Sequence, residues 1–420
     1  MYTEPAVALD ERVELASAEW LAESERFLGT RTRGLSLPAF SISERLDNPP
    51  PHLAASERDA PFGYTLRFAG DQVTAEPRPD ERANCYRVAD YTASVLYATI
   101  VYDGDAREGA VREAGHVTRM GLGDWQGRMP IDPISRLCGE LHDHMAARTV
   151  NSPDIRHRAE ALGLADNLSD LDERGYTILP GAFTEEFADE LRAEAHRNHD
   201  AAPPDVGFRA TMLLRRGRLW EEAVLHPWVL TLMEHLLGRG CLVYQSDTII
   251  KGPGLDTHPG LHSDYGASRI PEPFPDYCLE ATAVWAIDDF SLPNGPTVVM
   301  PGSVAKRSQA PKGATRDGTK PLVMERGSIA LWHGGLWHGA MPRSAPGKRT
   351  SLHNAYCRQF MRPLERYDDI PQEIVDRNPP AFATLCGLDD AFGKSGDHGA
   401  DFERLGYAAK MGYGATALPA

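Results

Sequence analysis

The segment CLVYQSDTIIK, residues 241–251, opens a run of strand-like sequence that decides the fold of this chain. Its β-branched and aromatic residues are typical of a strand. Four runs of similar texture follow: TAVWAI (282–287), TVVM (297–300), SIALWH (328–333) and TSLHNAYC (350–357). Many short strands without long helices between them predict a sandwich or barrel rather than a parallel α/β sheet. We therefore expect a mainly β fold with flanking helices, built on a jelly roll (double-stranded β-helix).

The sequence LDERGYTILPGAF, residues 171–183, marks the start of this β-rich region. It predicts a short strand that ends at Pro180-Gly181, followed by a helix capped by Thr184. The preceding sequence has another texture and predicts four features: an arm or peripheral helix with a linker in residues 1–60, strands over Tyr64–Val73 and Ser94–Tyr102, and a helix over Ile134–Ala147. We therefore expect an α+β N-terminal extension, residues 1–165, of unknown function and a jelly-roll domain, residues 166–420.

Charge and composition restrict the classes of partner. The 420 residues carry a formal net charge of −16, which repels nucleic acid and anionic membranes. The six cysteines include no CxxC pair, as expected in a reducing compartment. The N-terminal residues are acidic, unlike those of a signal peptide, and no run approaches the roughly 20 apolar residues of a membrane span. We expect a soluble, cytoplasmic protein with a small-molecule substrate; its oligomeric state stays open.

The segment LHSDYG, residues 261–266, contains the first candidate metal ligands. Side chains alternate in an extended segment, so His262 and Asp264 are expected to point to the same side and to bind one ion. Among the 15 histidines, His262 alone is followed two residues later by aspartate. Two imidazoles and one carboxylate leave coordination positions open and suit iron(II). A third ligand must come from elsewhere in the chain.

His338 is the preferred third ligand. In GSIALWHGGLWHGA, residues 327–340, it follows the Gly334-Gly335 turn, where the chain can re-enter the sheet. His333, at the end of the preceding strand, remains its competitor. Three other histidine groups have simpler interpretations: His258 with His262, which Pro259 and Gly260 keep out of a helix; His142-Asp143-His144, a solvated helix face; and His196 with His199, at a helix C-terminus.

A metal held by three protein groups leaves room for the 2-oxo acid of 2-oxoglutarate, whose far carboxylate then needs a cation. Arginine suits this role because its planar fork binds a carboxylate in bidentate fashion and stays charged when buried. Arg349, at the start of the strand TSLHNAY, is the candidate. An exposed, purely surface role for Arg349 stays open, and Lys348 and Arg343 are the alternative anchors.

The order and spacing of five segments resemble the phytanoyl-CoA dioxygenase family of iron(II)/2-oxoglutarate oxygenases, over Leu171–Pro363. The segments are DERGYTILPGAFTEEFADEL (172–191), YQSDTIIKGPGLDTHPGLHSDYG (244–266), WAIDDFSLPNGPTVVMPGS (285–303), GSIALWHGGLWHGAMPRS (327–344) and KRTSLHNAYCRQF (348–360). The resemblance implies a double-stranded β-helix that binds iron through His262, Asp264 and His338 and pairs 2-oxoglutarate with Arg349.

The resemblance implies weaker assignments as well. Gln245 and Trp285 would line the co-substrate pocket, although simple core packing explains Trp285 equally well. Ala340 departs from the family, because a small polar residue that contacts 2-oxoglutarate often stands two positions after the distal histidine. That contact is therefore in doubt here.

The resemblance implies a dioxygenase that uses Fe(II), 2-oxoglutarate and O₂, releases succinate and CO₂, and hydroxylates or otherwise oxidises a small molecule of specialised metabolism. Asp264 favours hydroxylation, because related halogenases carry Gly or Ala at that position. The alternative hypothesis is a non-catalytic or zinc-binding, cupin-like small-molecule binder. The extension could also be an independent protein-interaction module.

Overall fold

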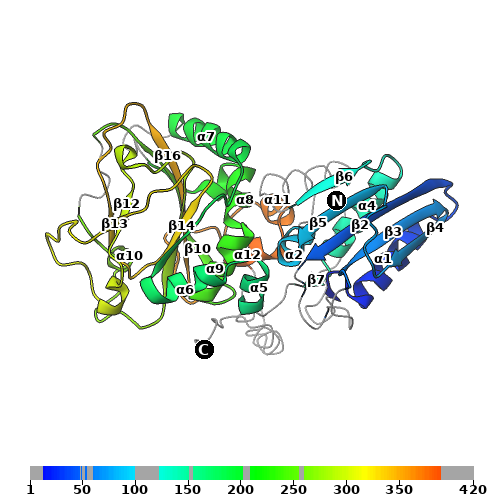
Figure 1. Cartoon of the computed structure of the whole chain (residues 1–420), viewed down its shortest axis with the longest axis horizontal. Coiled ribbons are helices and arrows are strands. Elements are labelled where there is room, and N and C mark those ends of the chain that lie inside the picture. The colour runs from blue at the N-terminus through cyan, green and yellow to red at the C-terminus, as the bar shows by residue number, and fades with distance from the viewer. Residues whose placement is uncertain are drawn as a thin grey trace. The chain divides into compact units, whose positions relative to one another are not determined.

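The structure is a computed structural model that describes residues 13–47, 49, 53, 60–99, 123–150, 155–201, 209–254 and 260–388 (Figure 1). The chain forms two compact units: the described residues of 1–163 with 370–383, and those of 164–369 with 384–388. From the sequence, all residues after 165 were expected to form one domain. In the structure, residues 370–383 belong to the first unit instead. In the described ranges, no helix combines the length and apolar character needed to cross a membrane.

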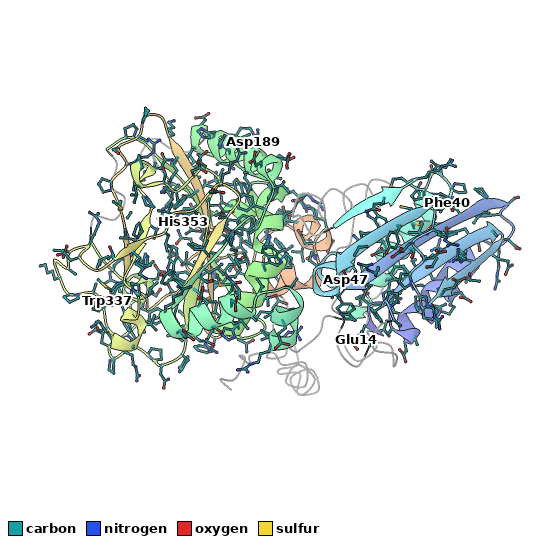
Figure 2. The ribbon with its side chains drawn as sticks, in the orientation of Figure 1. Glu14, Phe40, Asp47, Asp189, Trp337 and His353 are labelled. Carbon is teal, nitrogen blue, oxygen red and sulfur yellow. The ribbon has the colours of Figure 1, made fainter. Side chains whose placement is uncertain are left out.

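The second unit contains two antiparallel sheets. The larger has the order β8-β14-β11-β16-β10-β9 and the smaller the order β13-β12-β15. Their strands are β8 (Tyr176–Leu179), β9 (Arg209–Ala210), β10 (Leu242–Lys251), β11 (Glu280–Trp285), β12 (Thr297–Val299), β13 (Lys320–Pro321), β14 (Ile329–His333), β15 (His338–Ala340) and β16 (Arg349–Cys357). Figure 2 labels His353, on β16, and Trp337, just before β15. Two antiparallel sheets with flanking helices are consistent with the predicted jelly roll.

An apolar core lies between these sheets. It contains Val284 from β11 and Trp332 from β14, with Val299 from the smaller sheet. Because side chains alternate along a strand, neighbours that are paired across the ladder share one face. Thr282 pairs with Trp332 and with Ala355 of β16, so all three point toward this core. The inner face of the larger sheet therefore provides one wall of the site described below.

Helices precede and follow the first strand of this unit. They are α6 (Ala165–Arg174), α7 (Glu185–Asp200), α8 (Arg218–Val224) and α9 (Pro227–Leu237). As predicted, Thr184 caps α7: its Oγ1 accepts a hydrogen bond from the backbone N–H of Phe187 at 3.2 Å. Phe187 and Leu191, which lie one turn apart on α7, are fully buried and form its apolar stripe.

The first unit is built on a five-stranded sheet of order β4-β3-β2-β5-β6. Its elements are β1 (Val13–Glu14), α1 (Ala18–Arg31), β2 (Leu37–Asp47), β3 (Gly63–Gly70), β4 (Gln72–Glu76), β5 (Cys85–Asp90), α2 (Tyr91–Ala98), β6 (Gly123–Gly127), α4 (Ile134–Ala146), β7 (Thr149–Val150), α5 (Ile155–Ala161) and α11 (Gln372–Asp376); α12 (Pro380–Leu385) ends the described chain. Side chains of α1 and α4 pack on one face of the sheet in a single apolar cluster.

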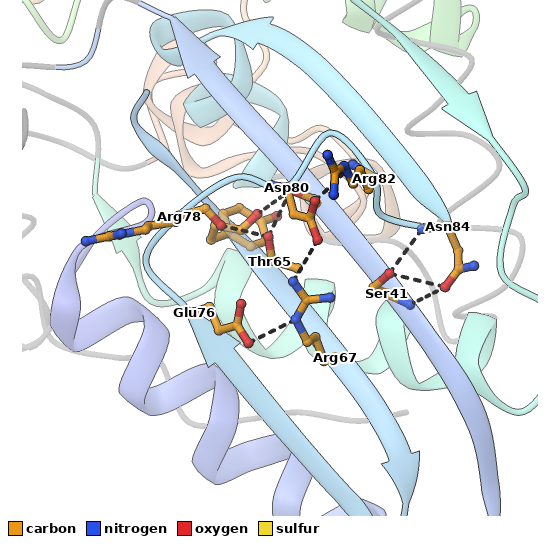
Figure 3. Close-up of polar contacts among 10 residues, drawn as sticks. Ser41, Thr65, Arg67, Glu76, Arg78, Asp80, Arg82 and Asn84 are labelled. Carbon is orange, nitrogen blue, oxygen red and sulfur yellow. Dashed lines mark hydrogen bonds and ion pairs between the residues drawn. The ribbon is translucent and has the colours of Figure 1, made fainter. Parts of the chain in front are cut away.

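The opposite face of this sheet is polar (Figure 3). Arg67 donates to Glu76 Oε1 at 2.9 Å and to Asp80 Oδ2 at 2.7 Å. The Ser41 hydroxyl donates to Asn84 Oδ1 at 3.1 Å. The sheet thus has a helix-covered apolar face and a hydrogen-bonded polar face, the usual division for a sheet that is half exposed.

Three expectations for the N-terminal region are wrong. Residues 91–98 form helix α2 where Ser94–Tyr102 was expected to be a strand, and residues 100–102 lie outside the described ranges. Periodicity alone does not separate a short apolar helix from a strand. Residues 18–47 are core elements instead of a peripheral arm. The strand structure expected over Tyr64–Val73 is present, divided between β3 and β4 of one hairpin. His144, expected on a solvated helix face, is instead buried: its ring stacks on Phe27, and its Nε2–H donates to Glu23 Oε1 at 2.6 Å.

Candidate metal centre

His262 and His338 are held side by side by backbone pairing. The two residues form an isolated antiparallel bridge, in which each N–H donates to the other's carbonyl at 2.9 and 2.8 Å. Their imidazole centroids lie 4.3 Å apart. The Nδ1 of His338 lies 3.0 Å from the Leu336 carbonyl, which only accepts, so Nδ1 carries the hydrogen and Nε2 is left to bind a metal.

Asp264 completes the group. Its carboxylate and the two histidines offer ligand atoms that all lie within 4.8 Å of one another. Asp264 Oδ1 faces His338 Nε2 at 3.4 Å. The segment was expected to be extended throughout, but Asp264 begins a one-turn helix, α10 (Asp264–Ala267). The three residues predicted from the sequence are therefore brought together, and they are the one such group in the described chain.

The second oxygen of Asp264 is fixed by hydrogen bonds from the larger sheet. The Thr282 hydroxyl and the Trp332 indole N–H each donate to Oδ2 at 3.1 Å. Both side chains lie on the inner face defined above. Outer partners of this kind orient a ligand and raise metal affinity. These two hydrogen bonds orient the Asp264 carboxylate so that Oδ1 faces the histidines.

Charge within the group keeps Asp264 ionised. Burial would raise the pKa of Asp264, but the neighbouring His338 and His262 and the hydrogen bonds to the carboxylate hold it below its usual range. Burial would likewise lower the pKa of His338, yet Asp264 and the Leu336 carbonyl raise it. Glu280 lies near this group, and burial, with repulsion from Asp264, raises its pKa to about 8. An ionised carboxylate between two imidazoles is a ready receptor for a divalent cation.

The competing histidine lies elsewhere. His333 follows Trp332 on β14, so its side chain points to the opposite face of the sheet. Its Nδ1 accepts a hydrogen bond from the Gly335 N–H at 2.9 Å, and burial lowers its pKa to about 4. Gly334 permits the turn between the two histidines, because an added Cβ would lie 2.5 Å from the Glu280 carbonyl. His338, and not His333, therefore joins the group.

The other histidine groups stay apart from this centre. His199 at the end of α7 contacts the Thr248 carbonyl at 3.3 Å, and His196 contacts the Thr350 hydroxyl at 3.4 Å. His258 lies outside the described ranges. Neither α7 histidine belongs to a set of three or more metal-binding side chains within the described residues.

Arg349 is buried on the same face of the sheet. Only 5% of it is exposed, its guanidinium carbon lies 3.9 Å from the centroid of the Phe290 ring, and Nη1 donates to the Gly295 carbonyl at 2.7 Å. Its Nε has no hydrogen-bond partner among the described residues. Burial and the nearby Arg343 lower the pKa of Arg349 to about 10, so it still carries its charge at neutral pH. This burial argues against the alternative of a purely surface role for Arg349.

Lys251, which no sequence pattern singled out, lies beside Arg349. The two residues are paired across β10 and β16, and Lys251 is fully buried. Its Nζ donates to the Met341 carbonyl at 2.5 Å and lies 3.4 Å from the Gly295 carbonyl. Gly295 itself has a φ of +66°, and an added Cβ would lie 2.6 Å from the Met341 carbonyl. Two buried basic side chains therefore lie side by side at one end of the inner face, where a carboxylate could contact both.

The alternative anchors do not fit this role. The two terminal nitrogens of Arg343 donate to backbone carbonyls of Ala345, Gly347 and Pro346 at 2.6–2.8 Å. Lys348 is exposed. Arg343 stabilises a loop and Lys348 faces solvent, which leaves Arg349 as the anchor candidate.

Gln245 and Trp285 have different positions. Gln245 is half-buried on β10 and pairs with Ala355, which shares the inner face with Thr282. Trp285 points to the opposite face, where it is fully buried and its ring packs 4.9 Å from that of Phe183. The expectation that Trp285 lines the pocket is therefore wrong, because strand alternation turns it into the core behind the sheet.

Comparison with known proteins gives this region a family. Residues 171–351 match the family model described as phytanoyl-CoA dioxygenase. This match covers less than half of the 420-residue chain. All of the residues assigned above to the metal and the anchor lie inside this range.

Individual relatives are distant. A dioxygenase of Aspergillus terreus, trt7, is 28% identical over 130 residues, which are 30% of this chain and 45% of the relative. HygX from Streptomyces hygroscopicus, solved with nickel and 2-oxoglutarate bound, matches 50% of this chain and 92% of its own at 17% identity and a TM-score of 0.40. SnoN, a non-heme alpha ketoglutarate dependent epimerase from nogalamycin biosynthesis, matches 47% and 83% at 19% identity and a TM-score of 0.40. The chain spans about half the length of the curated relatives it matches.

Trp332 and Thr282 are residues of this family site that the sequence patterns missed. Both belong to ordinary strands, and only the register of β11 and β14 brings them to Asp264. Replacing Trp332 with Phe removes the indole donor but keeps an aromatic ring. We expect the variant to bind Fe(II) about 10- to 100-fold more weakly, the usual cost of losing an outer hydrogen bond to a ligand. Anaerobic metal titration measures this change.

Trp285→Phe is the matched control, because Trp285 is buried on the opposite face of the same sheet. Its Fe(II) affinity is expected to equal that of the unmodified chain. Equal affinities for both variants would contradict a role for Trp332 in orienting Asp264.

Proposed function

We propose that this chain is an Fe(II)- and 2-oxoglutarate-dependent dioxygenase that oxidises a small molecule, with release of succinate and CO₂. The observation that carries the proposal is the convergence of His262, Asp264 and His338 at the inner face of the jelly roll. The family match over the same residues supports it. The finer proposals are that oxidation is hydroxylation, that the substrate belongs to specialised metabolism, and that the protein acts in the cytoplasm.

The donor set fits Fe(II). Two imidazole nitrogens and one carboxylate oxygen are its usual ligands in oxygenases, and three protein ligands leave positions for exogenous groups. The fixed tautomer of His338 and the two hydrogen bonds to Asp264 Oδ2 hold the donors in place. When bound, Fe(II) would supply the activation of O₂ that side chains alone do not provide.

The chain's own residues would bind and orient the reactants. Arg349, with Lys251 beside it, would hold the far carboxylate of 2-oxoglutarate. The apolar core between the sheets includes Phe290, which contacts Arg349, and Trp332, which contacts Asp264. These side chains would exclude water between the anchor and the metal. Gln245 lies on the same face and is available to contact the bound reactants.

Metal removal tests the proposed activity. Chain treated with EDTA and desalted is expected to form no succinate from 2-oxoglutarate in air, because activation of O₂ needs the metal. Added Fe(II) is expected to restore slow succinate formation even without the primary substrate, and a panel of small molecules then identifies compounds that accelerate it. Mass spectrometry of succinate is the measurement.

Zn(II) serves as the matched control metal, because it occupies the same ligands without redox chemistry. It is expected to give no succinate. Purified protein that holds one zinc per chain, and that forms no succinate with Fe(II) and any compound of the panel, would instead favour a zinc-binding small-molecule binder.

A further inference from the structure

The first unit contains a cavity of about 120 Å³, partly open to solvent, that the proposed reaction does not use. It lies on the apolar face of the five-stranded sheet. Side chains from β2, β3, β5 and β6 line it together with side chains from α1, α2 and α4. A pocket of this size interrupts the close packing that is usual beside a sheet.

A buried ion pair forms one end of the cavity. Glu44 on β2 and Arg87 on β5 are paired across the ladder, with Nη2 of Arg87 2.5 Å from Oε2 of Glu44. The Tyr64 hydroxyl donates to Glu44 Oε1 at 2.7 Å, and the Arg87 guanidinium carbon lies 4.8 Å from the Trp125 ring centroid. Desolvation of two charges makes such a pair a poor source of stability. The charged pairs that Arg67 forms lie on the polar face of this sheet instead (Figure 3).

Ser94 of α2 supplies a second polar group. It lines the cavity, is 3% exposed, and its Oγ has no hydrogen-bond partner within the described part of the chain. A buried hydroxyl without a partner is unfavourable, because it has lost its hydrogen bonds to water. A ligand that carries its own donor and acceptor would satisfy Ser94 and use the remaining acceptor capacity of Glu44.

The other walls are apolar and aromatic. They include Trp20, Ile42, Leu66 and Leu141, and the imidazole of His142 is the one further titratable ring among the described lining side chains. An apolar pocket with a few converging polar groups is typical of small-molecule sites. The charges of Glu44 and Arg87 already offset each other, so a charged ligand would leave an unbalanced charge in the pocket.

We propose that the first unit is a binding module for an uncharged small molecule with a flat, apolar body and a hydroxyl group at one end. The hydroxyl would meet Glu44 and Ser94, and the body would lie against Trp20 and Leu66. This proposal is independent of the metal centre, which lies in the second unit.

Calorimetric titration of the full chain with 2-naphthol tests this proposal, since this probe is neutral at pH 7 and has the stated shape. We expect one molecule bound per chain. Naphthalene, which lacks the hydroxyl, and 2-naphthoate, which is charged, should each bind at least about 10-fold more weakly. Absence of 2-naphthol binding, or equal binding of the three probes, would overturn the proposal.

Ser94→Leu fills the cavity and removes the hydroxyl, and it is expected to weaken 2-naphthol binding at least about 10-fold. Ala22→Leu, the same kind of enlargement at an exposed position of α1, is the matched control and should bind normally. Circular dichroism checks that both variants fold, and Ala98→Leu, also at the cavity wall, replaces Ser94→Leu if that variant unfolds. Unchanged affinity in the folded cavity variant would place the probe elsewhere on the chain.

Discussion

His338→Ala is expected to abolish stoichiometric Fe(II) binding and to lower succinate formation by more than about 100-fold. Removing a residue that only hydrogen-bonds to a metal ligand lowers metal affinity or activity by about 10- to 100-fold, and here a ligand itself is removed. The variant leaves only His262 and Asp264, and the hydrogen bond of His338 to the Leu336 carbonyl is lost with the ring. Iron analysis after anaerobic loading and removal of free metal, together with a succinate assay, measures both effects.

His333→Asn is the matched control for this experiment. His333 is five residues away and as buried as His338, but it lies outside the ligand group. Folded His333→Asn is expected to bind one Fe(II) and to form succinate at close to the unmodified rate. Loss of iron in the His333 variant with full iron in the His338 variant would reverse the assignment of the third ligand.

Local spacing explains why part of this centre could be predicted. The pair His262 and Asp264 depends only on two residues of separation and needs no knowledge of the fold. Choosing His338 over His333 required the bridge to His262, which is a long-range backbone contact. Before the structure, the Gly334-Gly335 turn and the family resemblance were the available guides. Tertiary pairing then decides between two histidines that are similar in sequence context.

The wrong predictions for Trp285 and for the stretch after Ser94 also arise because tertiary contacts are not visible in the sequence. Trp285 lies one position away from Val284, which faces the inner core, and a shift of one residue moves a side chain to the other face of a strand. Sequence reasoning identified the strand but not which face pointed inward. The sequence after Ser94 predicts a strand, although short apolar, β-branched runs occur in both helices and strands. Its helical conformation follows from packing, with Val95 fully buried in the core of the first unit.

Lys251 shows what strand pairing adds to the candidate site. In the sequence it is one lysine after the apolar run TII, with nothing to relate it to Arg349, 98 positions later. The antiparallel register of β10 and β16 puts the two cations opposite each other. Their placement predicts an anion-binding end of the inner face, which Arg349 alone suggested only weakly.

Arg349→Gln is accordingly expected to weaken 2-oxoglutarate binding by about 100-fold, or roughly 2.7 kcal/mol. The substitution keeps a polar side chain but removes the charge and the bidentate fork, and hydrogen bonds to a charged group contribute about 1.5–3 kcal/mol each. The 2-oxoglutarate affinity of Arg349→Lys should lie between those of the unmodified chain and Arg349→Gln, because lysine restores the charge without the planar fork. Anaerobic calorimetry of the Fe(II)-loaded chain gives the dissociation constants directly.

Lys348→Gln is the matched control, since it removes a neighbouring positive charge from an exposed position. Its affinity for 2-oxoglutarate is expected to be unchanged, whereas Lys251→Met should weaken binding, because Lys251 is buried opposite Arg349. Iron binding should persist in all four variants, since none of them alters a ligand. An Arg349→Gln chain that is folded, holds iron and binds 2-oxoglutarate normally would remove Arg349 from the site. The co-substrate would then have to be anchored by a cation other than the buried pair.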